Sequence, residues 1–286
     1  MIAAAGDIAC DPADPFCDGG AGRFPDKCQQ RATSDLLVKA GAGRRVAAAG
    51  QPYSSASLSK IQTVYHPAWG RVKSISHPVL GNHESSGRGN FDCFNGSGVF
   101  SGPAGTRGKG WYSYNLGDWH LIALHSNCTR PADTSDVVDC GVGSELERWL
   151  RTDLSLNQSR CSLTCWHHPR WSSGHDKNND FTQPFWQALY DARAEVVPVA
   201  HSHDYERFAP MDAGGNLNRS TGIREFVVGT GDAFFTGSSS RVTGSEIFDD
   251  QNFGVLKLAL GSESYSWRFE SQAGRSFTDS GTASCQ

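Results

Sequence analysis

Short clusters of aspartate, tyrosine, asparagine and histidine recur along this chain, and each of them follows a run of apolar residues. The runs have the length and composition of buried strands. The clusters are Gly6-Asp7, Tyr53, Gly81-Asn82-His83-Glu84, Trp166-His167-His168-Pro169 and His201-Ser202-His203-Asp204-Tyr205-Glu206-Arg207. Because the carboxyl ends of neighbouring parallel strands meet at one edge of a sheet, we expect these clusters to come together there.

Helical patterns alternate with these strands. The strands expected before the clusters are Ile2–Ala5, Val46–Ala49, Ile75–Leu80, Ser162–Trp166 and Glu195–Val199. Helices are expected at Gln29–Ala40, Ser57–Tyr65 and Phe185–Arg193, and after a capping box that begins at Ser144. Further strands are expected at Gly110–Leu116, His120–His125, Phe226–Gly229 and Phe253–Leu260, the last two closing the sheets. The alternation indicates an α/β protein, and the lack of a repeat or linker favours one domain over residues 1–286.

The charge and hydropathy of the chain argue against several partners. Its 286 residues carry a net charge of −4 and the pI is near 6.2, so neither nucleic acid nor an anionic membrane surface is expected as a partner. No apolar run approaches the roughly 20 residues that cross a bilayer. Met1 is followed almost at once by the first expected strand, which we interpret as a mature secreted form with an added methionine.

The nine cysteines favour an oxidising compartment. Cys10, Cys17 and Cys28 crowd one loop, and a second group consists of Cys128, Cys140, Cys161 and Cys165. Neither group has zinc-ribbon spacing, and Cys161 and Cys165 are too far apart for a redox Cys-x-x-Cys pair. We therefore expect disulfides with one thiol left over, in a secreted protein, although the spacing does not reveal which cysteines pair.

Taken singly, each polar cluster is weak evidence. A lone His-x-His motif is more often a structural pair than a pair of ligands, and Asp7 alone would be read as a turn residue. In this order, however, the clusters resemble the calcineurin-like metallophosphoesterases, and among them the purple acid phosphatases. The resemblance extends to Tyr65-His66-Pro67-Ala68-Trp69-Gly70 and to the tract from His167 to Gly174. It implies an α/β fold, a four-layer αββα sandwich of two mixed sheets flanked by helices.

The resemblance also implies roles for single residues around two metal ions. It assigns Asp7, Tyr53 and His203 to the first ion and Asn82, His167 and His201 to the second. The oxygens of aspartate and tyrosine favour Fe(III) at the first position, and the imidazole-rich second position suits Zn, Fe(II) or Mn. His83 is expected to face the leaving-group oxygen and the phosphate as a proton or hydrogen-bond donor, with Asn82 also contacting substrate and Glu84 orienting His83.

Other polar residues near the clusters have a functional and a structural interpretation. His175 lies one residue from where relatives place histidines that contact substrate, so we assign it to substrate; the alternative is a solvated loop histidine. His168 is expected to pack beside the site. The remaining residues are expected to be structural or to satisfy turns and strand ends: Asp204, Tyr205, Arg207, His125 and Asp232.

One expected ligand is missing. The family has Gly-Asp-x-x-Tyr where this chain has Ala49-Gly50-Gln51-Pro52-Tyr53, so Gly50 replaces the carboxylate that bridges the two ions. At an effective dielectric near 20, unit charges about 4 Å apart interact by ~4 kcal/mol, so two cations repel each other strongly without that anion. Both ions, one ion or a weakly binding silent site could result; we expect at least one ion to bind.

The leading hypothesis is a secreted, metal-dependent phosphoester hydrolase of the acid phosphatase type that acts on phosphomonoesters through a metal-activated hydroxide. Its partner would be a small-molecule phosphoester or another anionic substrate. A relative that binds an anionic ligand without catalysis is the first alternative. An enzyme repurposed for other chemistry is the second. The residues do not indicate an oligomeric state.

Overall fold

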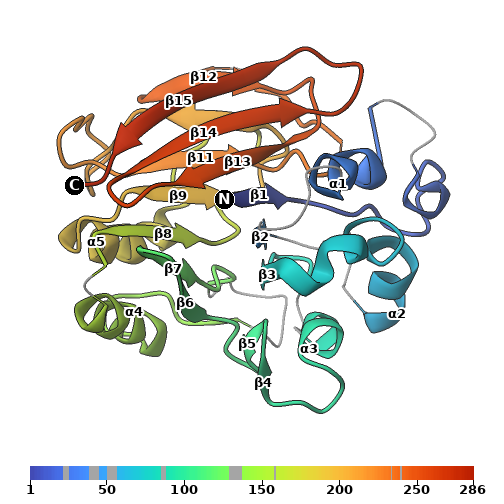
Figure 1. Cartoon of the computed structure of the whole chain (residues 1–286), viewed down its shortest axis with the longest axis horizontal. Helices are drawn as coiled ribbons and strands as arrows, with labels where there is room; N and C mark the ends of the chain where they lie inside the picture. The colour runs from blue at the N-terminus through green and yellow to red at the C-terminus, as the bar shows by residue number, and fades with distance from the viewer. Residues whose placement is uncertain are drawn as a thin grey trace.

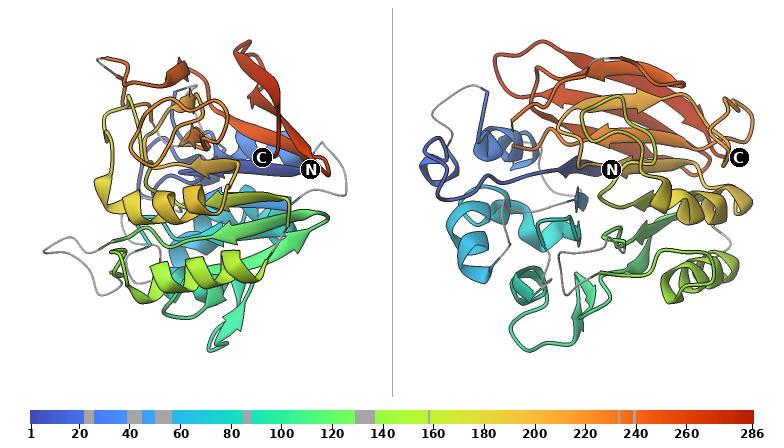
Figure 2. Two further views of the ribbon diagram at one scale, coloured as in Figure 1. Left: turned by 90° about the vertical axis from the view of Figure 1, so that its left-hand side faces the viewer. Right: turned by 180° about the vertical axis from the view of Figure 1, so that it is seen from behind.

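The computed structural model describes residues 1–21, 26–38, 45–49, 57–84, 88–128, 137–157, 159–232, 234–238 and 240–286, with residues 45–49 as backbone. Two large sheets pack face to face, and helices flank them on both sides (Figures 1 and 2). In Figure 1, α1, α2 and α3 lie on one side of the sandwich and α4 and α5 on the other. The four-layer αββα architecture implied by the resemblance is confirmed.

The first sheet has six strands in the order β15-β14-β13-β1-β2-β3. Its strands are β1 (Ile2–Gly6), β2 (Arg45–Ala49), β3 (Ser76–Val79), β13 (Gly254–Leu260), β14 (Ser264–Ser271) and β15 (Thr278–Ser284). Strands β1, β2 and β3 are parallel, while β13 pairs antiparallel to β1. The parallel strands therefore end together, directly before Asp7 and Asn82 in the case of β1 and β3.

The second sheet has seven strands in the order β12-β10-β11-β9-β8-β7-β6. Its strands are β6 (Tyr112–Leu116), β7 (Trp119–Ala123), β8 (Cys161–Cys165), β9 (Val196–Val199), β10 (Tyr205–Phe208), β11 (Arg224–Val228) and β12 (Ser245–Asp249). Strands β7, β8, β9 and β11 are parallel. A small separate hairpin joins β4 (Ser101–Gly102) and β5 (Gly105–Thr106).

The helices expected at Gln29–Ala40, Ser57–Tyr65, Phe185–Arg193 and after Ser144 are present, whereas the helix at Arg88–Phe94 was not predicted. The described helical segments are η1 (Asp18–Gly20), α1 (Gln30–Val38), α2 (Leu58–Lys60), the π-helical η2 (Ile61–Tyr65), η3 (Trp69–Ile75), α3 (Arg88–Phe94), α4 (Glu145–Leu156), η4 (Asp180–Thr182) and α5 (Gln183–Asp191). Helix α4 begins as predicted, because the hydroxyl of Ser144 accepts the N–H of Glu147 at 3.1 Å. Its Leu146 and Leu150 are buried against the second sheet.

Strand alternation divides the core into layers. On β1, Ile2 and Ala4 belong to the cluster between the two sheets, whereas Ala3 and Ala5 belong to the cluster under the helices of the first sheet. A third cluster joins the outer face of the second sheet to α4 and α5. Strands buried on both faces read as continuous apolar runs, which is why the runs before the clusters were recognisable in the sequence.

The prediction that Phe253–Leu260 closes the sheets is wrong. Strands β14 and β15 follow it and form the edge of the first sheet. Strand β15 consists mostly of small polar residues, so its apolar signal is weak. Strand β14 does carry a strand signal, since Tyr265, Trp267 and Phe269 alternate with polar residues and are buried in the core, and it was overlooked. Strand β10 was also missed, because it begins at Tyr205 directly after the expected ligands His201 and His203.

Three disulfides join Cys10 to Cys28, Cys128 to Cys140 and Cys161 to Cys285. Cys17, Cys93 and Cys165 are buried free thiols, so the expectation of a single unpaired cysteine is wrong. Cys161 pairs with the distant Cys285, so its sequence neighbour Cys165 stays a free thiol. Burial within the core raises the pKa of this thiol to about 12. Core packing accounts for such a thiol as a small apolar group.

A buried carboxylate at the opposite end of β9 from the clusters predicts a pH-dependent stability. Glu195 is 3% exposed and accepts the N–H of Ser162 at 2.5 Å, and its burial raises its pKa to about 7. The folded state then binds a proton that the unfolded state releases, so stability falls as pH rises from the ordinary pKa of 4.5 through 7. The full effect of such a shift is about 3 kcal/mol.

We therefore expect the free energy of unfolding of Glu195→Gln, relative to that of the native protein, to be higher at pH 8 than at pH 5. Glutamine retains an oxygen for the Ser162 N–H but carries no charge at either pH. Urea unfolding of metal-free protein with intact disulfides would measure the difference. An equal change in the free energy of unfolding at both pH values would contradict the assignment.

Candidate metal centre

The predicted clusters converge where parallel strands of the two sheets end. Strand β1 leads to Asp7 and β3 leads to Asn82 and His83, while β8 and β9 in the second sheet lead to His167 and to His201 and His203. The sheets are joined beside these residues, since the N–H of Gly231 donates to the carbonyl of Gly6 at 2.9 Å. The described residues brought together are Asp7, Asn82, His83, His167, His201 and His203.

Three donor atoms meet at the position expected for the second ion. Asn82 Oδ1 lies 2.8 Å from His167 Nε2, which in turn lies 3.2 Å from His201 Nδ1. Ligands about 2.1 Å from a tetrahedral ion are about 3.4 Å apart, so these separations are close to those of a shared coordination shell. One oxygen and two imidazole nitrogens are also a donor set that zinc and iron accept. The residues present fit a metal ion.

A second pair of potential metal-ligand atoms lies beside the first three. His203 Nε2 lies 3.7 Å from Asp7 Oδ1, too far for a hydrogen bond but suitable for two ligands of one ion. The other nitrogen of His203, Nδ1, donates to the carbonyl of Phe234 at 2.9 Å, which leaves the Nε2 lone pair toward Asp7. Asp7 is itself held by the N–H of His201, which donates to its Oδ2 at 2.9 Å.

The backbone is strained at two of these positions. Asp7 and His201 have φ values of +52° and +67°, in the left-handed region that non-glycine residues rarely adopt. Such conformations cost on the order of 1–3 kcal/mol and concentrate at functional sites. The strain turns the Asp7 carboxylate and the His201 N–H toward each other immediately after β1 and β9.

Burial sets the charge state of the site. It raises the pKa of Asp7 to about 8, with a smaller contribution from the negative charge of Asp176. Burial also lowers the pKa values of His167, His203 and His83, so the imidazoles are kept neutral with lone pairs available. A bound cation would offset the cost of burying the Asp7 carboxylate.

His83 lies near the proposed ligands without joining either donor set. His83 is partly buried. A charge on His83 would lower the pKa of His167, and a charge on His203 lowers the pKa of His83 in the same way. The loop that carries it is fixed by Glu84, whose carboxylate accepts the N–H of Gly81 at 2.5 Å. Asn127 also donates to the carbonyl of Gly81 at 2.7 Å. Glu84 thus holds the backbone of this loop.

His168 packs beside the proposed ligands, as expected. One nitrogen each of His167, His168 and His201 lie within 4.8 Å of one another, and the His168 and His201 ring centroids are 4.4 Å apart. The oxygen of buried Ser126 accepts the N–H groups of His167 and His168, so its own proton is available to His168 Nδ1 at 2.9 Å. No sequence signal distinguished this histidine from a packing residue.

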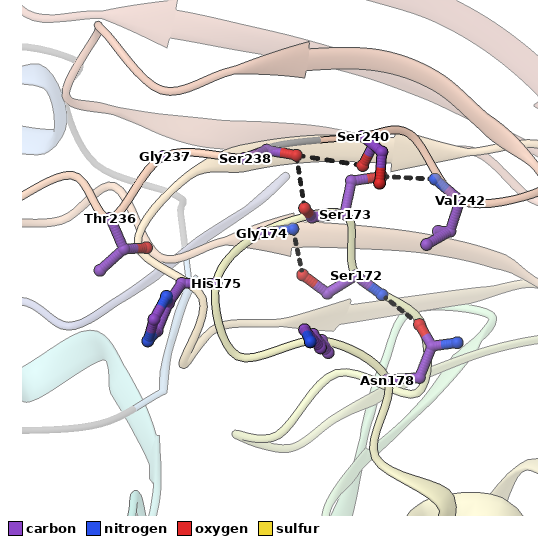
Figure 3. A pocket seen from close by; sticks show the side chains of 11 residues that line it. Ser172, Ser173, Gly174, His175, Asn178, Thr236, Gly237, Ser238, Ser240 and Val242 are labelled. Carbon is purple, nitrogen blue, oxygen red and sulfur yellow. Dashed lines mark hydrogen bonds between the residues drawn. The ribbon is translucent and has the colours of Figure 1, made fainter.

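A pocket opens beside the loop that carries Asp176. Its volume is about 760 Å³, and Figure 3 shows its lining from the loop at Ser172–Asn178 and from the segment that follows Thr236. Ser238 donates to the carbonyl of Ser173, and the N–H of Val242 donates to the Ser173 hydroxyl at 3.0 Å, so the two segments are joined. Exposed His175 lines this pocket. Its neighbour Asp176 approaches His201 Nε2 at 3.9 Å.

The other sequence assignments divide into two groups. Gly50 and Tyr53 lie outside the described residues. The residues expected to be structural have structural partners: Tyr205 and Arg207 both bind Asp279, Ser202 donates to Asp204, Asp232 accepts the N–H of Gln30 at the start of α1, and His125 contacts the carbonyl of Lys109.

Comparisons with known proteins agree with this geometry. No family profile matches the chain. It is 31% identical over 111 residues to the uncharacterized protein Rv2577 of Mycobacterium tuberculosis, covering 35% of this chain and 21% of that protein. It is 28% identical over 192 residues to purple acid phosphatase 23 of Arabidopsis thaliana, covering 60% and 40%. The solved structure of the purple acid phosphatase PPD1 from yellow lupin superposes with a TM-score of 0.73 at 19% identity, over 99% of this chain and 53% of that one.

The chain thus has the fold of the lupin purple acid phosphatase, and part of its sequence is similar to purple acid phosphatase 23. Its matches span less than half the length of these two curated relatives and about half of the lupin protein.

Proposed function

We propose that the chain is a metal-dependent phosphoester hydrolase that acts on phosphomonoesters. The convergence of Asn82 Oδ1, His167 Nε2 and His201 Nδ1 carries this proposal, because His167 Nε2 lies 2.8 Å from the oxygen and 3.2 Å from the other ring nitrogen, and all three atoms have lone pairs that can bind a metal. Asp7 and His203 supply donors for a neighbouring ion, and Tyr53 is the third proposed ligand there. Bound cations of this kind polarise a phosphoryl oxygen and acidify water.

The remaining residues would position and protonate the substrate. His83 lies beside both proposed ligand sets, so it can donate a hydrogen bond to a phosphate held there and a proton to the leaving oxygen. The amide of Asn82 is exposed and reaches the same space from the preceding position. Because burial lowers the pKa of His83, its protonated, proton-donating form is present only at more acidic pH than that of an unperturbed histidine.

The pocket supports a small-molecule substrate. A volume of about 760 Å³ is within the roughly 300–1,000 Å³ typical of small-molecule sites. His175, Lys177 and the amide of Asn178 line it and can donate hydrogen bonds to an oxygen-rich leaving group. We therefore assign the alcohol portion of the ester to this pocket and retain His175 as a substrate contact.

The disulfides support an extracellular location. Three are formed, one of them between the distant Cys161 and Cys285, and structural disulfides persist in oxidising compartments. Among the described residues, no helix has the length and apolar character needed to cross a membrane.

The first test is elemental analysis and a visible absorption spectrum of protein purified without chelator. We expect at least one ion per chain. Two ions, with Fe(III) at Asp7, Tyr53 and His203 giving a tyrosinate-to-iron absorption band and Zn, Fe(II) or Mn at Asn82, His167 and His201, would indicate an intact pair of metal sites. Clearly less than one ion per chain after reconstitution would contradict the proposal.

Gly50 favours one alternative, a relative that binds an anionic ligand without turnover. The proposed centre then retains affinity for phosphate but lacks the shared carboxylate that holds two cations together. Phosphate binding to the metal-loaded protein with no hydrolysis of p-nitrophenyl phosphate would favour this alternative.

A further inference from the structure

The three histidines proposed as ligands differ in what contacts the ring nitrogen that is not a proposed metal ligand. His203 Nδ1 donates to a backbone carbonyl at 2.9 Å, and buried His167 Nδ1 has no hydrogen-bond partner within the part of the chain that the structure describes. His201 Nε2 instead faces a carboxylate, Asp176 Oδ1, at 3.9 Å. His201 is thus the proposed ligand with an acidic side chain at its outer nitrogen.

Such a carboxylate has a defined effect on a metal-binding histidine. An acceptor at the outer nitrogen fixes the tautomer and the ring orientation, and it makes the nitrogen that faces the metal more basic. His201 Nδ1, the atom 3.2 Å from His167 Nε2, is the one that would gain. The present 3.9 Å is too long for a hydrogen bond and would have to shorten by about 1 Å to make a charge-assisted one.

The position of Asp176 suits this role. Its side chain is 29% exposed and that of His201 is 17% exposed, so the pair is partly shielded from water. Asp176 lies in the loop that lines the pocket, and the loop is packed onto the ligand segment: a Cβ added at Gly174 would lie 1.9 Å from Ser202 Oγ. The contact between the loop and the strand end is therefore built into the fold.

We propose that Asp176 is a positioning residue that orients His201 for the second metal ion and adds negative charge to a centre in which Gly50 supplies none. This inference rests on the proposed function, because it assumes that Asn82, His167 and His201 hold a metal. Loss of such a partner of a ligand typically lowers metal affinity by about 10–100-fold. Asp176 would act through His201 and would not touch substrate.

The test compares Co²⁺ binding to the full chain and to Asp176→Ala, Asp176→Glu and Asp118→Ala. Asp118 is an exposed carboxylate in the turn between β6 and β7, so its removal changes the net charge equally. We expect Asp176→Ala to bind the second Co²⁺ about 10–100-fold more weakly in chelator competition and to alter its d–d absorption. Asp176→Glu should recover part of the affinity, and Asp118→Ala should match the native protein.

Unfolding curves of the metal-free variants would show whether each is folded. Unchanged affinity and absorption in folded Asp176→Ala would overturn the role of Asp176 while leaving the proposed metal centre intact. A native protein that binds no Co²⁺ would overturn the proposed function, and the positioning role with it.

Discussion

Replacing His167 with alanine should remove one metal ion per chain and lower kcat toward p-nitrophenyl phosphate by about 10³-fold or more. His167 Nε2 is the atom that lies within 3.2 Å of both other proposed donors of the second ion, so its loss breaks the set at its centre. A catalytic metal supplies several kcal/mol of transition-state stabilisation, and about 4 kcal/mol corresponds to a factor of ~10³ in rate. Elemental analysis and steady-state kinetics on the same sample would measure both effects.

A histidine outside the centre provides the control. His66 is exposed after the π-helical η2, and His66→Ala should leave metal content and kcat near native values. Far-ultraviolet circular dichroism would confirm that both variants are folded. Full metal content together with native kcat in His167→Ala would show that the convergence of the three donor atoms is structural.

The convergence of the clusters could be predicted because chemistry and periodicity agree there, but the expectation of a single sheet edge is wrong, since β1 and β3 belong to the first sheet and β8 and β9 to the second. The mostly apolar runs before Asp7, Asn82, His167 and His201 form β1, β3, β8 and β9, whose residues are all buried except the half-buried His77. Parallel strands put those ends together, so five separated clusters were expected to form one site before any contact was known. The structure places the described members together, whereas their ligand roles stay predictions.

The parts that could not be predicted depend on contacts made by loops or edges. His168 became notable because Ser126, far away in the sequence, binds its ring and the backbone beside it. Asp176 approaches His201 because the loop before it is packed on Ser202. Neither contact leaves a periodic pattern. The edge strand β15 was missed for a related reason, since an exposed strand of small polar residues resembles a loop.

Gly50→Asp should tighten binding of the second metal ion by at least about 100-fold, and with it raise kcat/KM at limiting metal. A carboxylate about 4 Å from a cation contributes ~4 kcal/mol per unit of cation charge at an effective dielectric near 20, of which 2.7 kcal/mol already gives that factor. The spacing Gly50-Gln51-Pro52-Tyr53 is the basis for choosing position 50, since it matches the resembling family with the carboxylate replaced. Chelator competition, with total metal measured in parallel, would quantify the change.

The matched control is Gly50→Asn, which adds nearly the same volume without the charge. If the aspartate and asparagine variants bind metal equally, the centre does not lack an anion, and Asp176 or a bridging solvent or phosphate oxygen already balances the two cations. If the aspartate variant alone gains affinity but turnover stays negligible, the centre holds metal for anion binding. Gains in both affinity and turnover would show that the chain retains the machinery of a phosphoester hydrolase and that the charge missing at position 50 limits it.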